Sequence, residues 1–280
     1  NLRRMQYEVG WKKMDKRNTF RMRKPVRRKD RFKPVELTEE ARLRQAERMQ
    51  VTLESWKPKT ALGRNVKSGE ITSIDQILDA GQRIMEQEIV DALMSNLSSD
   101  LLMIGQAKGK FGGGQRRAFK QTQKKTAEGN KPSFATMVVI GNRNGYIGMG
   151  YGKSKETVLS REKAIRNAKL NIIKIRRGCG SWQCGCKTAH TIPFKVVGKC
   201  GSVKIELMPA PKGSGLTVAK ECRKILALAG IQDVWSKTFG QTSTTINLST
   251  ACFEALKSLG ERKVQPENIE SLGIIDGAKA

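Results

Sequence analysis

The stretch Tyr146–Lys153 (YIGMGYGK) limits the possible fold of this 280-residue chain more than any other. Every second residue from Gly148 to Gly152 is glycine, and apolar or aromatic residues alternate with the glycines: Ile147, Met149 and Tyr151. Successive side chains of a β-strand point to opposite faces, so one face of this strand is bare backbone. We expect either a closely packed helix or an RNA backbone to lie against that face.

Neighbouring residues complete a β-β-β-α unit, which we assign to residues 105–177. Phe119–Thr126 and Ser133–Gly141 are predicted strands, and Asn-Gly in the segment NRNG predicts a hairpin before the third strand. A helix follows, with an apolar face made by Val158, Ile165, Ala168 and Ile172. This is the core order of a double-stranded RNA-binding domain, which reads the shape of an A-form duplex. A small α+β domain with a solvated basic helix is the alternative, because a fold does not fix a function.

A second unit, of order β-β-α-β-α, is predicted over residues 191–260. Apolar and polar residues alternate in Ile192–Val196 and again in Val203–Leu207, which predicts a hairpin with one buried face. A helix that ends at Gly230, a third strand and a last helix that ends at Gly260 follow. The predicted fold class is therefore α+β, in two units.

The remaining segments precede, join and follow these units. Residues 1–55 are a basic N-terminal arm with a short helix, and we expect phosphates to order the arm by screening its charge. Residues 56–104 are predicted to be a helical lead-in that docks on the rest. Residues 178–190 are a linker that carries cysteines and a histidine, and residues 261–280 are a polar tail of little structural content.

The charge of the chain indicates a polyanionic partner. Lys and Arg number 53 against 26 Asp and Glu, a formal net charge of +27. Nucleic acid is the expected partner, since neutralised phosphates release counterions. A membrane is disfavoured, because no apolar run approaches the roughly 20 residues of a span. Aromatic residues make up only 5%, so the chain has few side chains on which unpaired bases could stack. This favours recognition of structured RNA by its shape.

A possible metal site lies in the linker. Cys179, Cys184, Cys186 and His190 supply four ligands that suit a tetrahedral structural zinc, and His190 is the only histidine of the protein. We see no signal peptide or lipidation motif and expect a cytosolic protein, in which cysteines stay reduced. The alternative is therefore a set of reduced cysteines in a loop, with His190 hydrogen-bonded at the start of a strand.

An enzyme is disfavoured. The glycine-rich stretch Gly105–Gly114 lacks the GxxxxGK[ST] pattern of a phosphate-binding loop. The single histidine lies among cysteines, and no paired acid and base accompany a predicted cleft. A catalytic cysteine in the linker is a third and disfavoured interpretation, since a cysteine nucleophile needs a base in a defined geometry.

Longer runs of sequence resemble the small-subunit ribosomal protein S5 family. They are the hairpin VVIGNRNGYIGMGYGKSKE, the helix AIRNAKLNIIKIRRG, and HTIPFKVVGKCGSVKIELMPAPKGSGL in the second unit. The lead-in WKPKTALGRNVKSGEITSIDQI and the segment RRGCGSWQCGC resemble the archaeal branch of that family. The resemblance covers roughly Trp56–Gly260.

The resemblance implies a structural rRNA-binding protein of the small subunit. It would lie near the decoding region and the path by which mRNA enters, support translational accuracy, and touch proteins of the S3, S4 and S8 families. Its first unit would be a double-stranded-RNA-binding-like domain and its second a left-handed β-α-β domain without a nucleotide site. The family's loop directed at the neck helix of the RNA matches about Lys124–Lys131.

We expect basic residues of the first unit, the linker and the second unit to contact phosphates: Arg116, Arg117, Lys120, Lys124, Lys125, Lys131, Arg143, Lys153, Lys155, Arg166, Arg176, Arg177 and Lys212. Replacing both Arg176 and Arg177 with glutamate is expected to weaken RNA binding at unchanged fold. A free-standing double-stranded-RNA-binding regulator is the alternative function. The charge of the arm favours permanent burial in RNA over that alternative.

Overall fold

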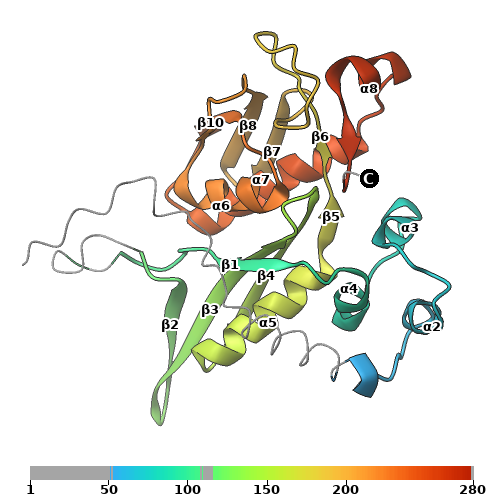
Figure 1. Ribbon diagram of the computed structural model, residues 1–280. Helices are drawn as coiled ribbons and strands as arrows, with labels where there is room; N and C mark the ends of the chain where they lie inside the picture. The colour runs from blue at the N-terminus through green and yellow to red at the C-terminus, as the bar shows by residue number, and fades with distance from the viewer. Residues whose placement is uncertain (1–50, 52, 108, 110–115, 279–280) are drawn as a thin grey trace, which may run out of the picture. The chain divides into compact units, whose positions relative to one another are not determined.

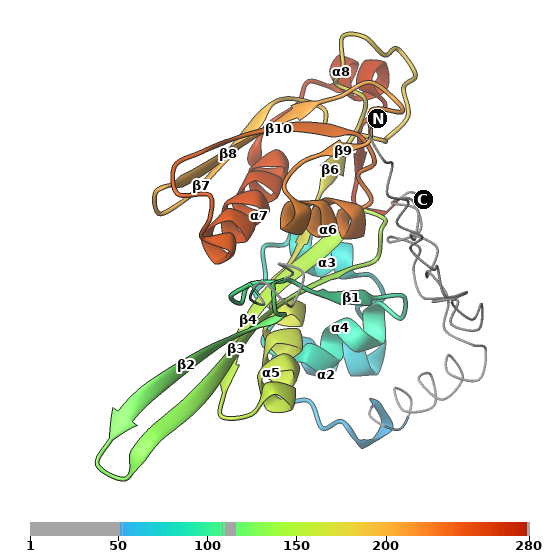
Figure 2. The same ribbon diagram turned by 90° about the vertical axis from the view of Figure 1, so that its left-hand side faces the viewer.

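The computed structural model describes residue 51, residues 53–107, residue 109 and residues 116–278. Most of the basic arm, its short helix and most of the glycine-rich stretch therefore lie outside the described residues. The described part is an α+β fold with two larger sheets, which confirms the predicted class (Figures 1 and 2). Within it, no helix is both long enough and apolar enough to cross a membrane.

The first unit is a five-stranded antiparallel sheet. Its central strands are β3 (Gly129–Gly141) and β4 (Tyr146–Ser154), and β5 (Ile172–Lys174) pairs with β4. On the other side of β3, β2 (Phe119–Thr126) pairs with its first part and β1 (Ser98–Leu101) with its last residues. The start of β3 pairs with β2 alone, so these two strands project from the sheet as a hairpin (Figure 2).

Two strands of this sheet differ from the prediction. β1 lies in the stretch assigned to the helical lead-in, so the sheet begins before residue 105. β5 takes the place of the last turn of the predicted helix. Helix α5 (Thr157–Leu170) stops at Asn171, and the β-branched Ile172 and Ile173 then pair with β4.

Helix α5 lies against the bare face of β4. A methyl group added to Gly150 would collide with the backbone of Ala164 and Ala168. The buried residues of the helix are accordingly small: Ser160, Ala164 and Ala168. Val158, which was predicted on the apolar face, is 59% exposed. The glycines thus serve close packing of a helix, and an RNA backbone has no room at this face.

Gly150→Ala is expected to destabilise the protein by about 3 kcal/mol, near the upper end for an overpacked core. The added methyl group meets backbone atoms, so a rotamer change cannot relieve the clash. Urea unfolding followed by circular dichroism measures the effect. Gly109→Ala is the control, because no atom of the described residues lies within 4 Å of the added methyl group there. An equal midpoint for both variants would contradict the close packing.

The lead-in comprises three short helices, α2 (Ala61–Ser68), α3 (Ile74–Asp79) and α4 (Gln87–Leu93). Their apolar side chains share a buried cluster with Tyr146 and Ile172 of the first sheet. Polar contacts join the same surfaces, since the Tyr146 hydroxyl donates to Asp75 at 2.7 Å and the Lys169 ammonium donates to Asp91 at 2.7 Å. The lead-in is therefore docked on the first unit.

The second unit is a four-stranded sheet of order β7-β8-β10-β9. Its strands are β7 (Val196–Cys200), β8 (Val203–Pro209), β9 (Leu216–Thr217) and β10 (Val234–Phe239). Helices α6 (Lys220–Ala229) and α7 (Thr245–Glu261) pack on one side of this unit (Figure 2). One large buried cluster combines side chains of this unit with others of the first sheet, among them Met137, Val139 and Ile147.

The seam between the units differs most from the prediction. Strand β6 (Arg176–Arg177) pairs with β11 (Ile275–Asp276), which belongs to the supposed tail, and α8 (Pro266–Leu272) precedes β11. The Cys179 amide donates to the Leu272 carbonyl oxygen at 2.8 Å, so the tail also holds the linker. Residues 261–278 are therefore attached to the fold by backbone hydrogen bonds, although α8 itself buries no residue.

Candidate functional site: a basic surface and a cysteine-histidine cluster

The projecting hairpin carries exposed lysines on both strands: Lys120, Lys124 and Lys125 on β2, and Lys131 on β3. Lys124 and Lys131 are directly opposed in the antiparallel register. Like charges in that position repel each other. One local acid moderates the repulsion, because the Lys131 ammonium lies 3.0 Å from a Glu128 carboxylate oxygen. Because the hairpin carries more ammonium groups than this acid offsets, its charge suits an anionic partner.

Other predicted RNA contacts are exposed as well: Arg116, Arg117, Arg143, Lys153, Lys155, Arg166 and Lys212. Lys153 is the second-last residue of β4 and Lys155 lies just before α5, while Arg166 lies on α5 itself. Arg143 occupies the turn between β3 and β4 with a left-handed φ of 58°. Lys212 belongs to a loop of the second unit. These residues are accessible to a partner, and Lys153 lies level with Lys120 of the hairpin, because both pair with Ala135 of β3.

Arg176 and Arg177 have partners inside the protein. The Arg176 guanidinium binds both Asp276 carboxylate oxygens at 2.6 and 3.0 Å and the Arg262 carbonyl oxygen at 2.6 Å. Arg177 is only 6% exposed, and its Nη2 donates to Asn144 Oδ1 at 2.7 Å and to the Gly277 carbonyl oxygen at 3.0 Å. Burial lowers the pKa of Arg177.

The expectation that Arg176 and Arg177 face phosphates is therefore corrected. Two adjacent arginines at the end of a basic helix look like a solvated pair in the sequence. The C-terminal strand that covers them is a hundred residues away along the chain. Their role is to hold that strand at the seam.

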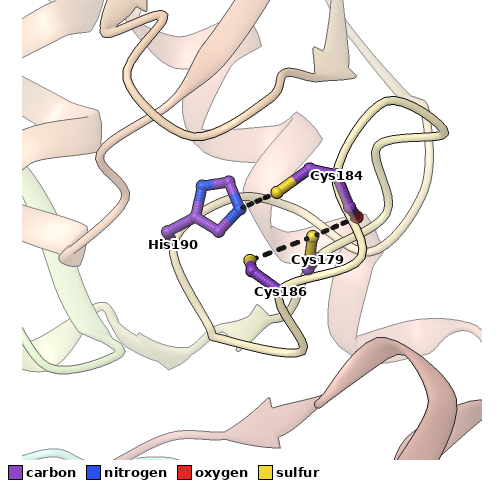
Figure 3. A group of neighbouring side chains, drawn as sticks. All are labelled: Cys179, Cys184, Cys186 and His190. Atoms are coloured by element: carbon purple, nitrogen blue, oxygen red, sulfur yellow. Dashed lines mark hydrogen bonds between the residues drawn. The ribbon is translucent and has the colours of Figure 1, made fainter.

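The four candidate metal ligands converge in the linker. One donor atom from each of Cys179, Cys184, Cys186 and His190 lies within 4.8 Å of the others. Figure 3 shows the three sulfur atoms and the imidazole ring turned toward one another. The Sγ atoms of Cys179 and Cys186 are 3.5 Å apart, and Cys184 Sγ is 3.9 Å from His190 Nε2.

These separations suit a tetrahedral metal ion. Metal–sulfur bonds of about 2.3 Å place two sulfur ligands about 3.8 Å apart. A disulfide would need about 2.05 Å, and all the cysteines here are free. Three thiols and one imidazole also match the donor set of structural sites without an open position. The cluster could therefore bind a metal.

Asp233 fixes the orientation of His190. Its Oδ2 lies 2.8 Å from His190 Nδ1, and both side chains are almost fully buried. The other carboxylate oxygen accepts from the amides of Gly213 and Gly215 at 3.1 and 2.7 Å. Because Nδ1 faces an acceptor, Nε2 is the nitrogen turned to the cysteines, as in metal sites whose histidine is oriented by a carboxylate. Sequence reasoning missed Asp233, which is 43 residues from His190.

The thiols of the cluster differ in their surroundings. Burial raises the pKa of Cys179 to about 11. A hydrogen bond with the Thr188 hydroxyl, at 3.0 Å, lowers the pKa of Cys186 to about 6. The neighbouring Trp182 is 88% exposed and takes no part in the cluster.

Comparison with known proteins covers both units. A model of ribosomal protein S5, N-terminal domain, matches residues 116–176, and one of its C-terminal domain matches residues 198–267. The small ribosomal subunit protein uS5 of Methanocaldococcus jannaschii is 48% identical over 229 residues, which are 82% of this chain and 99% of the relative. The protein of the same name from Nanoarchaeum equitans is 47% identical over 228 residues, or 81% and 98%. The chain therefore belongs to the ribosomal protein S5 family, in its archaeal form.

Proposed function

We propose that the chain is a structural constituent of the small ribosomal subunit, in the cytoplasm, that binds rRNA near the decoding region. It lies beside the path by which mRNA enters and supports translational accuracy. Membership of the ribosomal protein S5 family supports the ribosomal role. The neighbours that we propose are proteins of the S3, S4 and S8 families. The role is structural and not catalytic, as is general for ribosomal proteins.

The observation that supports RNA binding best is the projecting hairpin. Its strands pair over eight residues of β2, so backbone hydrogen bonds hold the lysines at fixed spacing. The opposed Lys124 and Lys131 repel each other in the free protein. Phosphates placed between them replace repulsion with attraction and release counterions. We therefore propose the hairpin as the main duplex-binding element of the first unit, with Arg116, Arg117, Lys153, Lys155 and Arg166 as further contacts.

Replacing Lys124 and Lys125 together with glutamine is expected to make RNA binding less dependent on salt. Each phosphate contact contributes about 0.9 to the slope of log affinity against log salt for a duplex, so the slope should fall by about 1 to 2. Fluorescence anisotropy with an RNA duplex of about 16 base pairs, titrated across a salt series, measures it.

The control variant removes two exposed lysines of the second unit, Lys220→Gln with Lys257→Gln. It changes the net charge by the same amount, so it separates a local contact from a general effect of charge. Equal slopes for the two variants would argue against the hairpin as a phosphate-binding element.

Sucrose-gradient sedimentation tests the ribosomal role against that of a free-standing regulator. We expect the tagged full-length chain in small-subunit fractions at moderate salt. Its absence from those fractions, with duplex binding retained, would support the regulator instead.

We further propose that the cysteine-histidine cluster binds a structural zinc. Cys179, Cys184 and Cys186 would supply thiolates and His190 its Nε2, the donor set that zinc prefers in closed sites. When bound, the ion would close the linker on itself, and His190 would connect it to Asp233, just before β10.

A further inference from the structure

The sheet of the second unit has one side that no helix covers. Gly198 lies so close to α7 that an added methyl group would meet the backbone of Ala251 and Ala255. The strand register places Ile205 opposite Gly198 on that same helix-covered side. The residues that alternate with Gly198 along β7 and with Ile205 along β8 point to the other side of the sheet, which we call the open face. No strand or helix of the described residues packs extensively against it.

Strand β10 lines the open face with two aromatic rings and a cation between them. Trp235, Lys237 and Phe239 alternate along it and are paired with residues of β8. Phe239 is 49% exposed, and Lys237 is exposed. The rings are four residues apart, which is about 13 Å along a strand. Composition predicted few surfaces for base stacking, yet the fold places two of the few aromatic residues on the same face.

The next strands add positive charge to the same face. Lys199 and Lys204 are directly opposed in the register of β7 and β8, so their charges repel each other. The Lys204 ammonium also lies 5.5 Å from the centre of the Phe239 ring. Lys195 lies just before β7 and extends the basic surface.

Among the described residues of β7, β8 and β10, one acid lies on this face. Glu206 accepts from the ammonium groups of Lys195 and Lys204, both at 2.8 Å. These bonds lower the pKa of Glu206 to about 2, so it stays ionised. Four ammonium groups thus stand against one carboxylate, and the face is positive.

We propose that the open face binds single-stranded RNA. Bases stack on Phe239 and Trp235, while phosphates lie near Lys237 and between Lys199 and Lys204. Aromatic rings alternating with cations on a sheet are the chemistry of single-strand platforms, which stack two or three bases. Lysine is depleted from protein interfaces, so its abundance here favours RNA over a protein partner. This site is separate from the duplex-binding hairpin of the proposed function.

The test compares two RNA probes on the full-length chain. Single-stranded octauridylate and a duplex of about 16 base pairs are titrated by anisotropy at fixed salt. Phe239→Ala should weaken octauridylate binding about fivefold or more, the effect of losing one stacked base, and leave duplex binding unchanged. Phe239→Trp should retain octauridylate binding, and so should Ile269→Ala, which removes an exposed apolar side chain of α8.

Three outcomes would overturn the proposal. They are unchanged octauridylate binding by Phe239→Ala, an equal loss for both probes, and equal losses for Phe239→Ala and Phe239→Trp. A second measurement addresses the assembled particle, with a photoreactive benzoyl-phenylalanine at position 239. Crosslinks to RNA support the site, whereas crosslinks to a protein alone, or none, overturn it. Failure of the hairpin lysine variants would leave this result intact, so the two proposals are tested separately.

Discussion

Arg177→Glu is expected to destabilise the protein by about 4 kcal/mol or more, since a buried charge then has no partner. The new carboxylate would face Asn144 Oδ1 and the Gly277 carbonyl oxygen, which are both acceptors. Burial already disfavours the arginine charge, as its lowered pKa indicates. The glutamate retains that cost and loses both hydrogen bonds. The β6–β11 pairing, and with it the seam, should weaken. Urea unfolding gives the change in midpoint.

Two other arginines serve as comparisons. Arg117→Glu changes an exposed side chain and should reduce RNA affinity with little effect on the unfolding midpoint. Arg176→Glu breaks a partly exposed ion pair with Asp276 and should cost about 1 kcal/mol. The interpretation of Arg177 fails if Arg177→Glu keeps the parental midpoint and instead lowers the salt dependence of RNA binding.

Cys184→Ser is expected to abolish binding of one zinc ion per chain and to lower the stability of the zinc-loaded protein. A ligand that binds only the folded state at a thousand times its dissociation constant contributes about 4 kcal/mol. Loss of the site should therefore lower the free energy of unfolding of the zinc-loaded protein by an amount of that order. Elemental analysis of the purified protein gives the stoichiometry, and thermal unfolding with and without a chelator gives the stability.

Cys200→Ser is the matched control for Cys184→Ser, because Cys200 is a free cysteine on β7, outside the cluster. It should keep the zinc. Asp233→Asn should keep the ligands but weaken metal affinity about 10- to 100-fold, because it alters the group that orients His190. A protein without zinc, in which Cys179, Cys184 and Cys186 all react with an alkylating agent under native conditions, would rule the site out.

Much of the architecture could be predicted from short-range patterns. The glycine alternation in Tyr146–Lys153 predicted a bare strand face, and α5 packs there. The hairpin signals predicted β3 paired with β4. They also predicted a hairpin that includes β8, but its partner β7 begins at Val196, where the predicted strand ended. The spacing of Cys179, Cys184, Cys186 and His190 predicted their convergence. These features could be found because the residues that form each one are close together in the chain.

The errors concern helix faces and segment ends. The pattern of apolar residues suggested that Val158 is buried on α5. Small residues are buried there instead, because the bare face of β4 lets the helix backbone come so close that larger side chains do not fit. Ile172 and Ile173 suit a helix or a strand, and the open edge of β4 decided for the strand. Neither outcome follows from periodicity, since each depends on the surface that the segment meets.

The sequence by itself determined the class of this protein: two α+β units, a strongly basic chain, and a compact set of metal-binding side chains. Only the tertiary structure decided which charged residues are available to a partner. Arg177 is buried by a strand about a hundred residues away, while Lys124 and Lys131 remain exposed on a hairpin. The physical reason is that burial and ion pairing depend on contacts between distant segments. The glycine-faced strand Tyr146–Lys153 was predictable because its constraint lies in its own backbone.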